Sequence, residues 1–434
     1  MKKRHLLLLL LTSISIVVDA QYVKSIEVSN PSDMTLLAQP VVIPLTEPIH
    51  SAIVTLNGNE IPCQLDDLDG DGQFDELCFL TDLKAHERQT FNIVLQNEGT
   101  PRQYEPQVYV EMLLSNKNIK EENKQDLYIS SLTVDRGTNP YWQLHHHGPA
   151  FENCLVAYRI YFDHRQTVDI YGKYHEGLEL HDTQFYPDSL QKATGYGDDV
   201  LWVGSTLGLG TLRGWNGKEP VMLEDVEHRT LRIIARGPLR TIVEVIDEGW
   251  DINTSSSTLP TPPITMTTRY TLYAGRRDCM VDIRFTHPSP LPHLPIYQFC
   301  TGIINVKNSL EFTDHNGLRG CWGTDWPVSA KDSAGHKRET VGLGICIPAA
   351  NVVNELPKDK RNYPYIVQPQ NNELHYAIAF CSDNEQFSRL HSSAEWFVWL
   401  QEWKQRLKVS VEQRIHSVPT AETSCSDGRN TLFR

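Results

Sequence analysis

Alternation of apolar and polar residues with a period of two dominates nearly the whole chain. Clear examples are residues 108–114, 231–235 and 279–285. Successive side chains of an extended chain point to opposite faces, so such runs indicate strands with one buried face. Glycine, proline and aspartate separate the runs, and the stretches 237–238 and 274–278 are typical of hairpin turns. The sequence therefore predicts an all-β protein of antiparallel sheets with few helices.

One late segment has the pattern of a helix instead. Ser392 and Glu395 form a capping box, and Trp396, Trp399 and Trp403 follow at helical spacing. We expect this stripe of tryptophans to pack against a sheet. An open platform for a sugar is the alternative.

Residues 1–20 have the pattern of a secretory signal peptide. A basic start precedes an apolar stretch from Leu6 to Val18, which is too short to span a bilayer as a helix. The first cysteine, Cys63, lies too far from this stretch for lipid attachment at a new N-terminus. We therefore expect a mature chain that begins at Gln21 and is periplasmic or secreted.

The polar segment 97–105 (NEGTPRQYE) lies between two strand-rich regions and indicates a domain boundary. We expect residues 21–105 to form a small β-sandwich and residues 106–417 a large antiparallel super-β-sandwich that carries the catalytic site. Residues 418–434 would form a flexible tail. Nine cysteines are scattered along the chain, and Cys63 and Cys78 are the pair whose positions suggest a disulfide.

The charge of the chain limits its partners. The formal net charge is -14, and no run of basic residues occurs. Such a chain is a poor partner for nucleic acid or for an anionic membrane surface. We expect a neutral ligand, or an acidic one held by a few local cations, while the oligomeric state stays open.

An acidic loop, LDDLDGDGQFDELCFL, occupies residues 65–80. Its aspartates are spaced by two and followed by Gly72, which matches the first half of an EF-hand loop, but the twelfth position is Cys78 rather than glutamate. The expected ligands of a structural calcium ion are Asp67, Asp69, Asp71, Asp75 and Glu76. The alternative is an acidic turn in which aspartates accept hydrogen bonds from their own backbone.

Residues 154–173 predict a hairpin with two distinct faces. Cys154, Val156 and Tyr158 belong to an apolar face. The opposite face would carry Arg159, Tyr161, Asp163, Asp169, Tyr171 and Lys173. Arginine can bind a carboxylate through two hydrogen bonds, and tyrosine can stack on a sugar ring or move protons. The alternative is a solvated face with cross-strand ion pairs.

Three histidines, His145 to His147, stand just before Gly148. Neighbouring side chains diverge, so a metal site that uses all three is disfavoured. A single histidine, with an ordinary pKa of about 6.5, is better suited to act as an acid or a base. A buried, hydrogen-bonded structural histidine is the alternative.

Further candidates for substrate binding are polar groups and tryptophans near glycine-rich loops. They are Glu152, Tyr196, Asp198, Asp199, Trp215 and Trp322. Tryptophans in such places either form platforms for sugars or close the end of a sheet. Motifs of serine hydrolases, nucleotide-binding proteins and zinc proteases are absent from the sequence.

Several motifs together resemble a known family. DLDGDGQFDEL, HHHGPAFE, AYRIYFDHR, DIYGK, GYGDDVLWVGSTLGLG and ARGPLR, in this order, resemble the secreted bacterial family catalogued as domain of unknown function 4861. The body also resembles the galactose-mutarotase-like super-sandwich of sugar epimerases and several polysaccharide lyases. The resemblance implies a role in the breakdown of pectin and other uronate-containing glycans. It favours His147, next to Gly148, as the functional histidine.

The leading hypothesis is a lyase or dehydratase that acts by elimination on a uronic-acid-containing oligosaccharide. Elimination needs a cation at the carboxylate, a base for the adjacent C–H, and an acid for the departing oxygen. Arg159 and Lys173 are the expected cations. The base would be His147 or Tyr171, and the acid would be Tyr161 or His146.

Three alternatives stay open at this point. Hydrolysis would use a carboxylate pair drawn from Glu152, Asp163, Asp169, Asp198 and Asp199. Mutarotation or epimerisation would use one glutamate and one histidine without breaking a bond between sugars. A glycan-binding protein would use the same aromatic and arginine side chains without an acid and base that converge.

Overall fold

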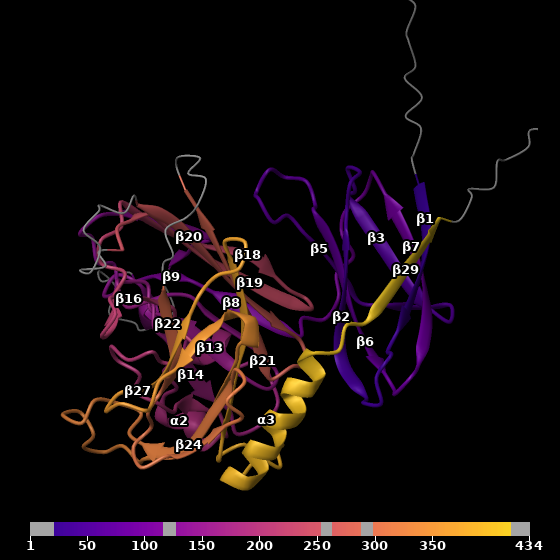
Figure 1. The fold of residues 1–434 in the computed structure, drawn as a ribbon. Helices are drawn as coiled ribbons and strands as arrows, with labels where there is room; N and C mark the ends of the chain where they lie inside the picture. Colours follow the sequence, from indigo (N-terminus) through magenta and orange to yellow (C-terminus); the bar gives the residue numbers. More distant parts are fainter. Residues whose placement is uncertain (1–20, 116–126, 253–262, 288–297, 418–434) are drawn as a thin grey trace, which may run out of the picture.

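A computed structural model describes residues 21–115, 127–252, 263–287 and 298–417 (Figure 1). Within these ranges the chain forms antiparallel sheets and three α-helices, so the predicted all-β fold is confirmed. The expected signal peptide and the expected tail lie outside the described residues.

The N-terminal domain is a sandwich of two sheets. One sheet has the order β29-β1-β7-β3-β4, and the other has the order β2-β6-β5. Their bounds are β1 (Gln21–Ser29), β2 (Leu36–Pro44), β3 (Ser51–Leu56), β4 (Asn59–Ile61), β5 (Cys63–Asp66), β6 (Glu76–Leu83), β7 (Arg88–Gln96) and β29 (Glu412–Ser417). The two sheets share one core, in which the ring centroids of Phe79 and Phe91 lie 4.7 Å apart.

The last strand, β29, differs from the expected division of the chain. It was expected in the second domain, but it pairs with β1, with Ile415 opposite Ile26. Val409 and Val411, just before it, pack against the core of the N-terminal sandwich. Apolar burial therefore draws the end of the described chain back to this sandwich, where Figure 1 shows β29 beside β1.

The second domain is built on a nine-stranded sheet. Its order is β11-β18-β19-β20-β21-β28-β25-β24-β23. The bounds are β11 (Ser131–Asp135), β18 (His228–Arg236), β19 (Arg240–Trp250), β20 (Ile264–Tyr273), β21 (Asp278–Thr286), β28 (Glu373–Ser382), β25 (Glu339–Cys346), β24 (Leu318–Asp325) and β23 (Leu310–Thr313).

Two five-stranded sheets face this large sheet. One consists of β15 (Asp198–Asp199), β14 (Val168–Gly172), β13 (Ala157–Ile160), β12 (Ala150–Asn153) and β8 (Val108–Glu111). The other consists of β17 (Pro220–Val221), β16 (Arg213–Trp215), β22 (Phe299–Ile304), β27 (Asn362–Val367) and β26 (Val352–Glu355). A short pair joins β9 (Leu113–Leu114) to β10 (Leu127–Tyr128).

The layers share one large apolar core. Tyr158 of β13 meets Phe380 of β28 at a centroid distance of 5.2 Å, and Phe285 of β21 stacks on Phe299 of β22 at 4.5 Å. These contacts join each five-stranded sheet to the same face of the nine-stranded sheet. The arrangement fits the expected galactose-mutarotase-like super-sandwich.

The helices are α1 (Leu180–Thr183), α2 (Ser189–Ala193) and α3 (Ser393–Leu407), with 3-10 turns at His145–His147 and Ala349–Asn351. Ser392 caps α3 through the backbone N–H of Glu395. Trp396 and Trp403 are buried and donate to the Leu343 carbonyl and to Asp278 Oδ2, at 3.1 and 3.0 Å. The prediction that the stripe packs against a sheet is confirmed. No helix within the described ranges is long and apolar enough to cross a membrane.

The suggested disulfide does not form. Cys63 lies opposite Phe79, and Cys78 lies opposite Gln64, on the neighbouring strands β5 and β6. Both cysteines are buried and free. They therefore act as small apolar side chains in the core.

Candidate functional site

The two-faced hairpin predicted for residues 154–173 is present as β13 and β14. Arg159 pairs with Asp169 across the two strands. Tyr158 and Ile170 point into the main core. The side chains of Arg159 and Asp169 therefore lie on the outer face of the five-stranded sheet.

Five polar side chains meet on this outer face. We call Arg159, Tyr161, Asp169, Tyr186 and Asp199 the Arg159 cluster. Arg159 donates to Asp169 Oδ2 from Nε and Nη2, at 2.9 and 2.6 Å, and Nη2 also donates to Asp199 Oδ2 at 2.8 Å. Its Nη1 donates to the Tyr186 hydroxyl at 2.7 Å, and the Tyr161 hydroxyl donates to Asp169 Oδ2 at 2.9 Å.

The two carboxylates of the cluster differ in access. Asp169 is fully buried and accepts from Arg159 and Tyr161, whereas the side chain of Asp199 is 15% exposed. Burial raises the pKa of Asp199 well above its ordinary value, and the neighbouring charge of Asp169 raises it further, against the effect of Arg159. Asp199 is therefore the accessible carboxyl group, and it keeps its proton at higher pH than an ordinary aspartate.

A second group lies beside the cluster. We call Tyr141, Trp142, His147 and Arg165 the His147 stack. The His147 ring stacks on Tyr141 at a centroid distance of 3.7 Å, and it lies edge-to-face with the Trp142 ring at a centroid distance of 5.2 Å. The Arg165 guanidinium lies over the Tyr141 ring at 4.4 Å. The ring of Tyr161 touches both groups, since it lies 6.0 Å from His147 and 5.0 Å from the Arg165 guanidinium.

His147 is held as a neutral imidazole. Its Nδ1 lies 3.0 Å from the Tyr141 carbonyl oxygen, so Nδ1 carries the proton and donates it. Nε2 then has a lone pair, and no residue in the described part of the chain hydrogen-bonds to it. Burial lowers the pKa of His147 to about 4, and the charges of Arg159 and Arg165 lower it as well. His147 can therefore accept a proton at Nε2 at neutral pH.

The backbone around His147 is strained and tightly fitted. His146 and His147 have φ values of 39° and 70°, which residues other than glycine rarely adopt. A Cβ added to Gly148 would lie 1.9 Å from the Ile160 carbonyl oxygen, so only glycine fits beside β13. Phe162 donates its N–H to the His147 carbonyl at 2.9 Å. These contacts fix the imidazole relative to the hairpin.

Lys173 does not join the Arg159 cluster, in contrast to the prediction. It is fully buried and donates to Glu152 Oε2 at 2.5 Å, to the Asn153 carbonyl at 2.7 Å and to the Gly177 carbonyl at 2.5 Å. These three bonds use all of its N–H groups. Glu152 is also committed, because its Oε1 accepts from the backbone N–H groups at the start of α1. Neither residue can reach a substrate.

Tyr171 and His146 are also unavailable as base or acid. The hydroxyl of Tyr171 donates to Glu179 Oε2 at 2.9 Å, and burial raises its pKa above the ordinary value. His146 is buried, with its Nε2 3.0 Å from Glu111 Oε1. Both residues take part in buried polar pairs beneath residues 174–197, which cover part of the outer face of this sheet. The structural alternative thus describes His146 better than a catalytic role.

Five other predicted residues lie outside the cluster. Asp163 is buried and accepts hydrogen bonds from Arg165 at 2.8 and 2.5 Å, so it fixes the position of the Arg165 guanidinium in the His147 stack. Tyr196 donates to Asp182 at 2.7 Å, and Asp198 forms an exposed ion pair with Lys192. The two tryptophans are partly buried elsewhere: Trp215 lies in β16, and Trp322 packs under α3.

Four residues of the site had not been predicted. They are Tyr141, Trp142, Arg165 and Tyr186. Trp142 and Tyr186 are 72% and 42% exposed, so they present open aromatic surface beside the cluster. The Tyr-Trp pair just before the histidines is a usable signal in the sequence, whereas Arg165 lies between the two strands of the predicted hairpin, where alternation gives no information.

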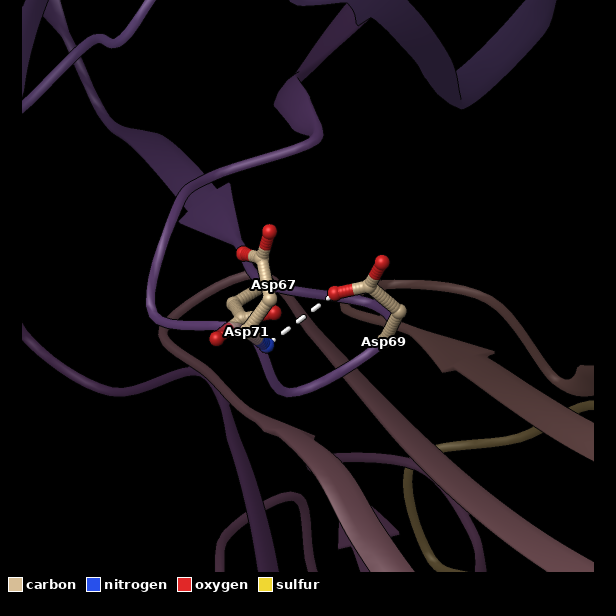
Figure 2. A group of neighbouring side chains, drawn as sticks. All are labelled: Asp67, Asp69 and Asp71. Atoms are coloured by element: carbon tan, nitrogen blue, oxygen red, sulfur yellow. Dashed lines mark hydrogen bonds between the residues drawn. The ribbon is translucent and has the colours of Figure 1, made fainter.

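The acidic loop joins β5 to β6. Carboxylate oxygens of Asp67, Asp69 and Asp71 lie within 4.8 Å of one another (Figure 2). The aspartates also accept backbone N–H groups: Asp67 from Gly70 at 2.7 Å, and Asp69 from Asp71 at 3.0 Å. The geometry thus contains the hydrogen-bonded turn, and its three clustered carboxylates also suit a cation.

Asp75 and Glu76 do not complete the expected ligand set. Asp75 Oδ2 accepts from the Leu68 N–H at 2.6 Å. Glu76 forms an ion pair with Arg240 of the large domain at 2.7 Å. Arg269 also donates to the Leu68 carbonyl at 3.1 Å, so the loop rests on β20. Glu76 therefore contributes to the domain contact.

A family model described as Domain of unknown function (DUF4861) matches residues 28–412. The chain belongs to this family. The matched span of this DUF4861 protein includes the acidic loop, the Arg159 cluster and the His147 stack.

Solved structures give distant likenesses to the DUF4861 chain. A glycosyl hydrolase family 38 protein from Enterococcus faecalis is 10% identical, with a TM-score of 0.44 over 92% of this chain and 48% of its own. An alpha-mannosidase from Enterococcus faecalis V583 is 10% identical, with a TM-score of 0.41 over 90% and 46%. The chain thus spans about half the length of these proteins. Among curated protein sequences, none matches it significantly.

Proposed function

We propose that this DUF4861 protein is a carbohydrate-active enzyme that acts by elimination on uronic-acid residues of an oligosaccharide. The observation that carries the proposal is that the neutral His147 and the accessible Asp199 belong to two groups that meet at the ring of Tyr161, on a surface with two exposed aromatic rings. Elimination next to a carboxylate needs a base, a cation and an acid. The Arg159 cluster and the His147 stack together offer all three.

Each role has one best candidate. His147 Nε2 would remove the proton from the carbon next to the substrate carboxylate. Arg165, part of the same stack and 19% exposed, would hold that carboxylate in place of Lys173. Asp199, with its raised pKa, would protonate the departing oxygen. Arg159 would orient Asp199, and Trp142 and Tyr186 would contact the sugar rings.

The geometry supports hydrolysis less well. Hydrolysis by the usual route needs two carboxyl groups that both reach the substrate. Asp169 is fully buried and saturated with hydrogen bonds, and Glu152 and Asp163 are tied to Lys173 and Arg165. Asp198 is partly exposed but is paired with Lys192 and lies outside the Arg159 cluster, so Asp199 is the one accessible carboxyl group of that cluster. Epimerisation would use the same base and acid, so the products must separate it from elimination.

The test is incubation of the purified protein with a panel of uronate-containing oligosaccharides. Products are read by mass spectrometry and by ultraviolet absorbance together. Elimination predicts a new absorbing double bond, with or without chain cleavage. Cleavage with water added and without absorbance would contradict the proposal in favour of hydrolysis. A product of unchanged mass and altered configuration would contradict it in favour of epimerisation.

We also propose that the acidic loop binds a structural calcium ion through Asp67, Asp69 and Asp71. The three carboxylates would repel one another without a cation, and hard oxygen ligands suit calcium. Because the loop rests on Arg269 of the large domain, an ion there would stiffen the contact between the domains.

Removal of calcium should lower the melting temperature by a few degrees, since a bound ligand stabilises the folded state by about 2.7 kcal/mol at a hundredfold excess over its Kd. The measurement is thermal unfolding with calcium and with chelator. Asp69→Asn and Asp71→Asn keep the acceptor for the turn but lose charge, so they should abolish the calcium effect. Asp33→Asn, at an exposed ion pair with His86, is the matched control. Equal melting temperatures with calcium and with chelator would contradict calcium binding and leave the loop as a hydrogen-bonded turn without a metal ion.

The pattern of residues 1–20 supports a further proposal, that the protein is periplasmic or secreted. N-terminal sequencing of the protein from its native cells should give Gln21 as the first residue. Retention of Met1 in the mature protein would contradict this.

A further inference from the structure

A hollow of about 300 Å³ lies where the N-terminal sandwich, the nine-stranded sheet and α3 meet. Its walls come from residues 35–39 around the start of β2, from the turn at 275–278 between β20 and β21, and from Trp399, Trp403 and Arg406 of α3. Figure 1 shows α3 along the large domain, leading into β29 of the N-terminal sandwich. The lining shares no residue with the Arg159 cluster or the His147 stack.

Only some of the N–H groups of the arginines that line the hollow donate hydrogen bonds to acceptors of the described chain. Arg277, whose side chain is 9% exposed, donates from Nη1 to the Phe380 carbonyl at 3.2 Å and to Glu385 at 2.8 Å. No residue within the described ranges accepts a hydrogen bond from its Nε or Nη2. Arg276 donates to Asp278 from Nε and Nη2, and Arg406 contacts Glu402 at 3.5 Å.

Each arginine of the hollow has one acidic partner: Asp278 for Arg276, Glu385 for Arg277 and Glu402 for Arg406. Of these acids only Asp278 lines the hollow, and its oxygens already accept from Arg276 and from Trp403. The Nε and Nη2 groups of Arg277 are therefore left as donors for a ligand in the hollow. An anionic group is therefore the natural occupant.

The rest of the lining is apolar. Leu36, Leu37, Leu155 and Trp399 contribute carbon surface next to the guanidinium groups. A ligand that matches both parts has one acidic group and one face of C–H groups. The volume lies at the small end of ligand pockets, which suits one or two sugar residues.

The backbone of β2 is irregular at this wall. Ala38 has a φ of 46°, and the register with β6 shifts between Leu36 and Gln39. A Cβ added to Gly275 would lie 3.1 Å from the Ala38 Cβ, so the two domains touch here. Bulges and strained residues concentrate at functional sites, where they redirect side chains.

We propose that this hollow is a second binding site, for a carboxylated sugar of one or two residues. Arg277 and Arg406 would bind the carboxylate, while Trp399 and Leu37 would contact the sugar ring. Because the ligand would touch β2 and α3 at once, it would hold the two domains together. The site does not depend on the chemistry at His147.

The test is calorimetric titration of the full chain carrying Arg165→Ala, which weakens the first site, with D-galacturonate and digalacturonate. We expect one ligand per chain. Arg406→Ala should weaken binding roughly tenfold through loss of a charge-assisted hydrogen bond, and Leu37→Trp should abolish it by filling the hollow. Arg284→Ala on β21, where Arg284 forms an exposed ion pair with Glu373 of β28, is the matched control and should bind as before.

Three outcomes would overturn the proposal. The first is that neither acid binds, and the second is that Arg406→Ala and Leu37→Trp bind the acids as tightly as the protein without these substitutions. The third is that galactose or inorganic sulfate binds as tightly as the two acids. The last would show that the carboxylated sugar is not what the site recognises. Turnover by Arg406→Ala with Arg165 intact is measured separately. Turnover tests the elimination reaction at His147 and the titration tests the second binding site, so failure of the first proposal would leave the titration result valid.

Discussion

Replacing Lys173 with methionine is expected to lower the free energy of unfolding by about 3–5 kcal/mol, because Glu152 would become a buried and unpaired charge. Both side chains are fully buried, 2.5 Å apart, and the lysine also satisfies two backbone carbonyls. Lys173 therefore holds residues 174–197 on the sheet, and this segment contributes Tyr186 to the Arg159 cluster. The measurement is denaturant unfolding of the variant and the wild type.

A matched control and a rescue make this result specific. Lys192→Met removes an exposed ion pair with Asp198 and should cost only about 0–1 kcal/mol. The double variant Lys173→Met with Glu152→Leu replaces both charges and should recover much of the loss. Wild-type stability of Lys173→Met together with lost turnover would contradict the structural role and restore the catalytic one.

His147→Gln is expected to lower kcat/KM on the uronate substrate by about 10²–10⁴-fold, the usual contribution of a positioned general base. The stability of the variant should change little by comparison, since the ring lies in a partly open stack. His375→Gln on β28, where His375 forms an exposed ion pair with Asp282 of β21, is the matched control and should keep full activity. Full activity of His147→Gln would remove this residue from the mechanism.

The pH dependence adds an independent readout for His147. The base works in its neutral form, and burial lowers its pKa to about 4. In the wild type, kcat/KM should therefore fall as the pH drops through about 4 and stay level above it on the acid side. His147→Gln should lack this fall. The same lowered pKa means that folding favours the neutral ring, so its contribution to stability is complete above pH 6.5 and lost as the pH falls through about 4.

The sequence predicted the sheet architecture and the hairpin well, because both depend on a period of two. Tyr158 and Ile170 face the core, and Arg159 and Asp169 face outward together, as the alternation indicated. Alternation cannot say what covers the outer face. Residues 174–197 lie over part of it, and this cover turned Lys173 and Tyr171 into buried partners of Glu152 and Glu179.

The missed residues depend on contacts between distant parts of the chain. Tyr186 reaches Arg159 from the cover, and Tyr141 and Arg165 meet only because the loop before Gly148 folds back on the hairpin. The pairing of β29 with β1 is likewise non-local. Local patterns in one sequence do not encode such pairings, which are decided by tertiary packing.

The fate of the C5 hydrogen of a uronate residue distinguishes elimination from hydrolysis at this site. The wild-type protein is given an oligogalacturonate that carries deuterium at C5, next to the carboxylate, and the products are followed by ultraviolet absorbance and mass spectrometry. Elimination predicts that the absorbing product appears more slowly than from the undeuterated substrate and has lost the deuterium. Products that keep deuterium at C5 and contain an added water would instead show hydrolysis, and elimination would be excluded.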